Sequence, residues 1–147
     1  VFDKLDADLA KAIFSIGAVK GFEIGDGFTA ACAMGSEHND SFCSETTESG
    51  PKISKRTNHS GGVLGGMSDG STICFRAAVK PTPSISRPQK TVTASGEEIE
   101  LSIHGRHDPI IVPRAVVVIE SMAAITVLDA LLKNMSSRMD SLLRFYQ

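Results

Sequence analysis

The densest group of reactive side chains in the sequence is Arg106, His107 and Asp108, between Gly105 and Pro109. An arginine can form two parallel hydrogen bonds to a carboxylate or phosphate, a histidine titrates near neutral pH, and an aspartate can move a proton. These residue types indicate binding of an anionic ligand together with proton transfer. They also fit a surface loop in which Arg106 and Asp108 pair with each other, and the types alone name no reaction.

A second candidate is Lys80 with the hydroxyl side chains Thr82 and Ser84, which alternate with prolines in the sequence KPTPS. An ammonium and two hydroxyl groups in a stiff segment are the donors that a phosphate monoester requires. The alternative is a proline-rich surface turn with a solvated lysine. Both interpretations are compatible with the residues.

The third candidate is the glycine-rich sequence TNHSGGVLGG at residues 57–66. Glycine pairs allow the backbone to approach a ligand closely, and exposed amides in such a turn can surround an anion. The spacing matches neither the phosphate-binding loop of nucleotide hydrolases nor the dinucleotide-binding fingerprint. The residues alone therefore favour a flexible glycine-rich loop over an anion site.

The remaining metal-capable residue types do not form a recognisable ligand set. Residues 37–40, EHND, are adjacent on one loop, and adjacency does not produce a closed coordination shell, so we expect no metal. Cys32, Cys43 and Cys74 lack CxxC spacing, which favours free thiols in a reducing compartment.

Composition places the 147 residues in the class of soluble globular proteins with one domain, since 41% are hydrophobic and 22% charged. The formal net charge of −2 argues against nucleic acid as a partner. The most apolar stretch, residues 115–132, contains Glu120 and Asp129, which favours a buried helix over a membrane span.

Hydrophobic spacing predicts the elements that must position these candidates. Apolar residues at three- and four-residue spacing indicate a helix over residues 3–16, capped by Asp3. Residues 19–24 and 28–34 are predicted to form a hairpin around the turn at residues 25–27. Residues 35–71 have the composition of one long loop, which in a compact domain is functional or disordered.

The second half of the sequence predicts more strands and a long helix. Residues 72–80 alternate, with Ile73, Phe75, Ala77 and Val79 on the predicted buried face. After a loop at residues 81–88, strands are expected at 91–93 and 98–103, so the sheet is mostly antiparallel. Pro113 suits the first turn of a helix that continues past Leu132 and, because it is apolar on most sides, is expected in the middle of the fold.

Six blocks of the sequence, in this order, resemble the chorismate synthase family. They are VFDKL at 1–5, KGFEIGDGF at 20–28, GSEHND at 35–40, TNHSGGVLGG at 57–66, KPTPS at 80–84 and RHDP at 106–109. The resemblance extends over residues 1–132, and residues 133–147 are expected to be a C-terminal helical extension. Family members are much longer, and the chain begins at Val1 without an initiator methionine. We therefore expect a C-terminal portion that lacks the N-terminal half.

The resemblance implies a fold and an activity. The fold is α+β, a β-α-β sandwich with a mostly antiparallel sheet packed on long central helices, of which this chain is about half. The family converts 5-enolpyruvylshikimate 3-phosphate to chorismate and phosphate by trans-1,4 elimination with reduced FMN, in aromatic amino acid biosynthesis, and NADP belongs to the same expectation through flavin reduction. A homotetramer is implied, in the cytoplasm or, in a plant, the plastid, with neither nucleic acid nor membrane as a partner.

The resemblance also implies roles for individual residues. Gly17, Ala18 and Gly65 would contact the flavin through their backbone. The phosphate and ribityl end would be held by Lys80, Pro81, Thr82, Pro83 and Ser84. Arg106 would lie between flavin and substrate, Asp108 would assist proton movement at the flavin, and Asn58 and His59 would belong to a loop that approaches the site.

One departure from the family pattern affects this site, because Pro83 stands where many members have a serine and so removes one amide donor. The catalytic histidines and several substrate-binding arginines of the family belong to the N-terminal half. We therefore expect the chain alone to be inactive. The alternative function is a non-catalytic module that keeps the fold for oligomerisation or ligand binding.

Overall fold

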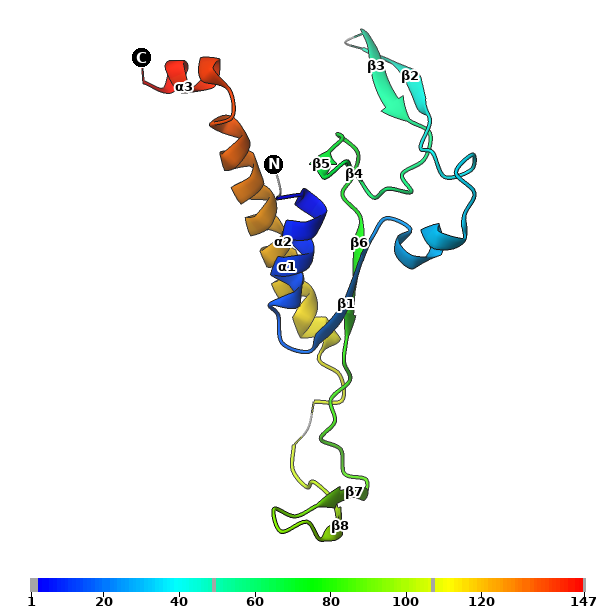
Figure 1. The fold of residues 1–147 in the computed structure, drawn as a ribbon, viewed down its shortest axis with the longest axis vertical. Helices are drawn as coiled ribbons and strands as arrows, with labels where there is room; N and C mark the ends of the chain where they lie inside the picture. Colours follow the sequence, from blue (N-terminus) through cyan, green and yellow to red (C-terminus); the bar gives the residue numbers. More distant parts are fainter. Residues whose placement is uncertain (1–2, 49, 107, 147) are drawn as a thin grey trace.

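The computed structural model describes residues 3–48, 50–106 and 108–146. The helices are α1 (Leu5–Phe14), the 3₁₀ helix η1 (Gly27–Cys32), α2 (Val112–Met135) and α3 (Met139–Phe145). The strands are β1 (Val19–Ile24), β2 (Phe42–Thr47), β3 (Gly50–Lys55), β4 (Val63–Leu64), β5 (Met67–Ser68), β6 (Phe75–Val79), β7 (Gln89–Val92) and β8 (Glu98–Leu101). The described strands form antiparallel pairs, as predicted, but as separate two-stranded ribbons in place of one sheet. Figure 1 shows that the chain is drawn out, with β2–β3 and β7–β8 at opposite ends.

The centre of the fold is the ribbon of β1 and β6, which pairs Val19 with Val79 at one end and Ile24 with Phe75 at the other. The predicted alternation along β6 is confirmed, because Phe75, Ala77 and Val79 are less exposed than the residues between them. This strand ends directly before Lys80. The ribbon therefore fixes where the KPTPS segment begins.

Helix α1 packs on this ribbon through the apolar face that its spacing predicts. Leu5, Leu9 and Ile13 are buried, and Val63 from the glycine-rich segment joins them in the core. The predicted cap by Asp3 is wrong, because Lys4 occupies the N-cap position without a side-chain hydrogen bond. The amide of Leu5 instead donates to the carbonyl oxygen of Gly66 at 2.8 Å, so the loop satisfies the free helix end.

The predicted hairpin between residues 19–24 and 28–34 is wrong in its second strand. Residues 27–32 form η1, and β1 pairs with β6. The amide of Gly25 donates to the carbonyl of Cys74, and the amide of Asp26 donates to the carbonyl of His59, both at 2.8 Å. The amides of the turn are therefore bonded to distant segments, and the chain does not fold back on β1.

The interpretation of residues 35–71 as one long loop is also wrong. This stretch contains the hairpin β2–β3 and the short ribbon β4–β5. Both faces of β2 and β3 are largely solvated, and Phe42 and Ile53 are among the most exposed apolar residues of the chain. Without a buried face there is no apolar alternation in the sequence, which is why the pattern gave no signal.

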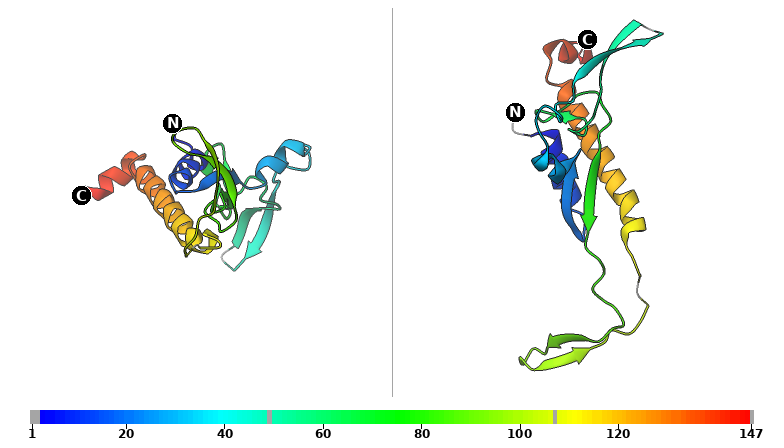
Figure 2. Two further views of the ribbon diagram at one scale, coloured as in Figure 1. Left: turned by 90° about the horizontal axis from the view of Figure 1, so that it is seen from below. Right: turned by 90° about the vertical axis from the view of Figure 1, so that its right-hand side faces the viewer.

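The strands expected at 91–93 and 98–103 are confirmed as the hairpin β7–β8. Two segments, residues 80–88 and the described parts 102–106 and 108–111, join this hairpin to the rest of the chain and lie alongside each other in Figures 1 and 2. The hydroxyl of Ser102 donates to the carbonyl of Ser86 at 2.8 Å and ties the two segments together. The KPTPS and RHDP blocks therefore lie on neighbouring segments.

The long helix is confirmed as α2, with proline in its first turn as predicted. It lies beside α1, and Ala123 and Ala130 pack partly on the core. Its expected burial is not achieved, because no described α2 residue is buried and Val117 and Ile125 are at least 60% exposed. Its length and composition would also allow a membrane span, a test that the core helices of soluble proteins pass too. The helix ends at Met135, so the helical extension after it includes the separate α3.

Candidate functional site

The β1–β6 ribbon brings two of the candidate segments into direct contact. The amide of Lys80 donates to the carbonyl oxygen of Ala18 at 2.7 Å, immediately outside the paired strands. Ala18 has a φ of 68°, a left-handed conformation that is uncommon for a residue with a side chain. Gly17, next to it, has nothing within 4 Å of the position a Cβ would occupy, so its backbone is open to a ligand.

The hydroxyl of Thr82 is placed as expected for a group that binds a ligand. Its Oγ1 is buried and, within the described part of the chain, is the buried side-chain oxygen or nitrogen without a hydrogen-bond partner. A buried polar group normally has a partner, and leaving it unpaired costs about 1–3 kcal/mol. Lys80 is exposed and Ser84 is partly exposed on the same segment. A phosphate group fits this donor set, because it would take the free hydroxyl and the ammonium as partners.

Across from this segment, Asp108 forms an ion pair at the start of α2. Arg114 Nη1 donates to Asp108 Oδ2 at 2.6 Å, and both side chains are more than a third exposed. The alternative correctly predicts an ion pair at Asp108, but the partner is Arg114 and not Arg106. Arg106 is exposed on the segment that runs beside residues 80–88, and His107 lies outside the described residues.

The glycine-rich segment is held from inside by Asp40, which the sequence offered only as a metal-capable residue type. The buried carboxylate of Asp40 accepts hydrogen bonds from the Thr57 hydroxyl at 2.7 Å, the His59 amide at 2.8 Å and the Ser60 amide at 2.9 Å. These amides are therefore unavailable to an anion. The alternative of an anion cradle therefore has no support in this part of residues 57–66.

Asp40 belongs to a buried charged network. Burial by itself raises the pKa of Asp40, but hydrogen bonds from Ser60, Thr57 and His59 outweigh it and hold the pKa well below its ordinary value. Lys55 lies 4.0 Å from Asp40 and bonds directly to Asp69. The bond to Lys55 is the main cause of a lowered pKa at Asp69 as well. Both carboxylates are therefore charged at neutral pH and anchor the loop.

The first glycine pair serves close backbone packing, whereas Gly65 is open. A Cβ on Gly61 would come within 2.3 Å of the Gly25 nitrogen, and one on Gly62 within 2.6 Å of the Thr72 carbonyl oxygen. These glycines let the loop pack against the end of the β1–β6 ribbon. Gly65 has a φ of 59°, is exposed and has nothing near its Cβ position.

The structure does not place Gly65 beside Lys80. Gly65 lies near the Ile24–Phe75 end of the ribbon, and Lys80 follows Val79 at the other end. The five residues of β6 separate the two ends by about 13 Å. A ligand that touched both residues would have to lie along the ribbon.

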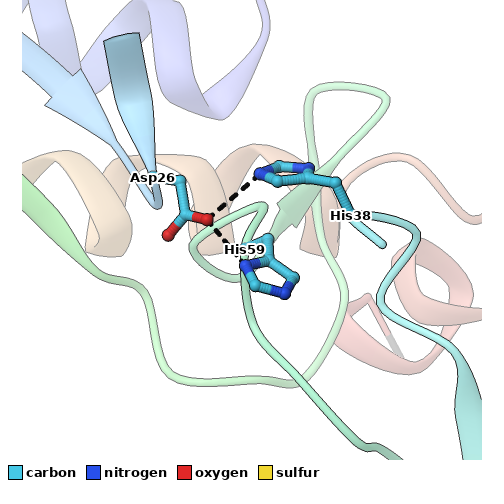
Figure 3. Close-up of side chains that lie close together, drawn as sticks. All are labelled: Asp26, His38 and His59. Atoms are coloured by element: carbon cyan, nitrogen blue, oxygen red, sulfur yellow. Dashed lines mark hydrogen bonds and ion pairs between the residues drawn. The ribbon is translucent and has the colours of Figure 1, made fainter. Parts of the chain in front are cut away.

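Asn58 and His59 use their side chains within the chain. The Asn58 amide group donates to the Thr72 carbonyl at 2.8 Å and accepts from the Gly62 amide at 2.8 Å. His59 Nδ1 lies 2.6 Å from Asp26 Oδ2, which His38 Nε2 also approaches at 3.1 Å (Figure 3). His38 therefore does not act with its neighbours in residues 37–40. It joins a cluster assembled from three separate segments.

Comparison with known proteins identifies relatives over nearly the whole chain. The chorismate synthase family model matches residues 1–132. A protein named chorismate synthase from Lachnoclostridium phytofermentans is 66% identical over 147 residues, and one named chloroplastic chorismate synthase from Capnoides sempervirens is 54% identical over 132 residues. The chain spans 39% of the first relative and 29% of the second.

A solved structure shares the fold. A crystal structure of chorismate synthase matches 90% of this chain with a TM-score of 0.67 and 33% sequence identity, over 31% of its own length. The chain thus has part of that α+β fold, with helices packed on antiparallel strands.

Proposed function

Because this chain belongs to the chorismate synthase family, we propose that it supplies the part of the enzyme that binds the flavin phosphate. The reaction would be the conversion of 5-enolpyruvylshikimate 3-phosphate to chorismate and phosphate, with reduced FMN as cofactor. The observation that carries the proposal is the buried hydroxyl of Thr82 in the KPTPS segment, which has no hydrogen-bond partner among the described residues.

Several residues around Thr82 would hold the FMN phosphate and ribityl chain. Lys80 contributes a positive charge, Ser84 contributes a second hydroxyl, and Pro81 and Pro83 restrict the backbone between them. The hydrogen bond from the Lys80 amide to Ala18 fixes this segment against the backbone of residues 17 and 18. Gly17, Ala18 and Gly65 would contact the flavin by backbone alone, consistent with the open space at both glycines.

Two charged residues on the neighbouring segment would serve the chemistry. When bound, reduced FMN supplies electron density transiently during loss of phosphate. Arg106 is exposed and would bind the anionic substrate beside it, because a guanidinium forms paired hydrogen bonds with carboxylate or phosphate. Asp108 is oriented by its ion pair with Arg114 and would accept or return a proton at the flavin.

We propose that this activity needs residues beyond those of the present chain. The chain covers 39% of the Lachnoclostridium phytofermentans relative, and its longest apolar helix has no buried residue among those described. The rest of the family fold would cover α2 and complete the site. A cytoplasmic homotetramer is the assembly we propose for the complete enzyme, with NADP-linked reduction of the flavin.

Titration of the chain with FMN and with riboflavin tests this proposal. Binding of FMN at micromolar concentration, with much weaker binding of riboflavin, is the expected result because the phosphate provides the main contacts. Equal affinity for the two flavins contradicts a phosphate site at Thr82. If neither flavin binds to the chain or to a complete enzyme that contains it, the alternative of a non-catalytic module is favoured.

A further inference from the structure

Asp26, His38 and His59 converge on one point from three segments of the chain. Asp26 lies in the turn after β1, His38 in the segment before β2, and His59 in the glycine-rich segment. Asp26 Oδ2 lies 3.1 Å from His38 Nε2 and 2.6 Å from His59 Nδ1, and Figure 3 shows both rings directed at this carboxylate. The two imidazole rings stack with centroids 4.6 Å apart.

We propose that these three side chains form a binding site for a divalent transition-metal ion of the zinc class. Two imidazole nitrogens and one carboxylate are a ligand set that such ions bind, and one more coordination position stays open for water. The ligand atoms lie within 4.8 Å of one another. Ligands of one zinc ion are roughly 3–3.5 Å apart, so small ring rotations suffice to place all three in its coordination shell.

The nitrogen that each ring offers follows from the geometry. His38 would bind through Nε2 and His59 through Nδ1, since these atoms face Asp26. Without metal, each ring donates a hydrogen bond from that nitrogen to the carboxylate. On binding, each neutral ring carries its proton on its other nitrogen, and the ion replaces both hydrogen bonds to Asp26.

The backbone holds the ligands in place before a metal arrives. The Asp26 amide donates to the His59 carbonyl at 2.8 Å, the His59 amide donates to Asp40, and the His38 amide donates to the Met34 carbonyl at 3.1 Å. Little backbone conformational entropy would therefore be lost on binding, which favours affinity.

The cluster is also accessible to an ion from solution. The side chains of His38, His59 and Asp26 are 22%, 30% and 40% exposed. His38 and His59 line an open groove of about 680 Å³. An ion bound here would connect the segment before β2 to the glycine-rich segment and hold the turn after β1 in place.

This proposal replaces the expectation of no metal, which considered only the adjacent residues 37–40. Of those residues, His38 alone joins the cluster, and Asp40 accepts backbone hydrogen bonds instead. The partners of His38 are 12 and 21 residues away along the chain, a separation that no local motif reveals.

Titration of the metal-free chain with Co²⁺ and Zn²⁺ tests the site. Co²⁺ should bind with one equivalent per chain and give visible ligand-field absorption bands, which Zn²⁺ then removes by displacement. His38→Gln and Asp26→Asn should each weaken binding by at least the roughly 10–100-fold that loss of a ligand's own partner costs. The matched control is His104→Gln, an exposed histidine elsewhere in the chain, and it should bind as the wild type does.

Thermal unfolding separates metal binding from a purely hydrogen-bonded cluster. His38→Gln can still donate to Asp26, so its circular dichroism spectrum should match that of the wild type. Zn²⁺ should raise the unfolding temperature of the wild type and of His104→Gln but not of His38→Gln. No stoichiometric Co²⁺ binding by the folded wild-type chain overturns the proposal, as does equal loss of binding in the His104 control.

Discussion

The backbone amide of Lys80 donates a 2.7 Å hydrogen bond to the carbonyl of Ala18, which joins the end of β6 to the residue before β1. The two residues are 62 positions apart in the sequence, and antiparallel strand pairing alone brings them together. Both belong to the segments that we propose to hold the flavin. The ribbon therefore determines which backbone groups face the phosphate-binding side chains.

Thr82→Val should weaken FMN binding and leave riboflavin binding unchanged. Valine keeps the shape of threonine but removes the hydroxyl that has no partner in the described chain. The loss should be about 1.5–3 kcal/mol, the value of a hydrogen bond to a charged group. Fluorescence titration with both flavins measures it. Because no existing bond is broken, the chain without flavin should be no less stable, and a destabilised variant would show that Oγ1 has an internal role.

Asp108→Asn should lower turnover at saturating substrate by roughly 10²–10⁴-fold while FMN and substrate binding largely survive. The test uses a chimera in which this chain replaces the matching part of the Lachnoclostridium phytofermentans relative. Arg114→Gln is the matched control, since it removes the ion pair at the other partner. If both variants act alike and keep most turnover, Asp108 only orders the loop.

Asp40→Asn should destabilise the fold by about 1.5–3 kcal/mol. The asparagine side chain is uncharged and has one accepting oxygen, so it cannot accept all three hydrogen bonds from the Thr57 hydroxyl and the amides of His59 and Ser60. Urea unfolding of the chimera measures the change. Asp140→Asn, an exposed ion-paired aspartate, is the control and should stay within about 0.5 kcal/mol of wild type.

The same carboxylate makes stability depend on acid. The pKa of Asp40 is lower in the folded chain than its ordinary value of 3.8, so the unfolded chain binds more protons as the pH falls. The stabilisation is complete above that ordinary value and is lost as the pH drops toward the lowered pKa. The difference between the urea midpoints of wild type and Asp40→Asn should therefore be constant from pH 7 to about pH 5 and smaller at pH 3, and a difference that stays constant would contradict the pKa shift.

Local patterns predicted some of this fold well. The faces of α1 and β6 follow from periodicity, because Leu9 of α1 lies in the core and Phe75 of β6 stacks on Phe22, which packs against that core. The strand at residues 28–34 failed because Gly25 and Asp26 bond to Cys74 and His59, far along the chain. The network of Asp40, Lys55 and Asp69 gave no signal, since its successive members are 15 and 14 residues apart. Lys80, Arg106 and Asp108 were singled out as candidates because their types and spacing are themselves chemically informative.

The chain alone should form no chorismate from 5-enolpyruvylshikimate 3-phosphate, even with reduced FMN under anaerobic conditions. It spans 39% of its relative, and the catalytic histidines that the family resemblance implies lie outside it. The chimera with the relative's remaining residues should turn over under the same conditions. Turnover by the chain itself at a rate similar to that of the chimera would show that these residues are sufficient.

The most direct test of a flavin-phosphate site is the affinity of Lys80→Ala for FMN and for riboflavin, measured by titration in the chimera. Lys52→Ala, an exposed lysine on β3, serves as the matched control. If this segment holds the phosphate, Lys80→Ala should weaken FMN binding by about 1.5–3 kcal/mol and leave riboflavin binding unchanged, and the control should affect neither. Equal weakening of FMN and riboflavin, or an unchanged FMN affinity, would contradict the assignment of the phosphate to this segment.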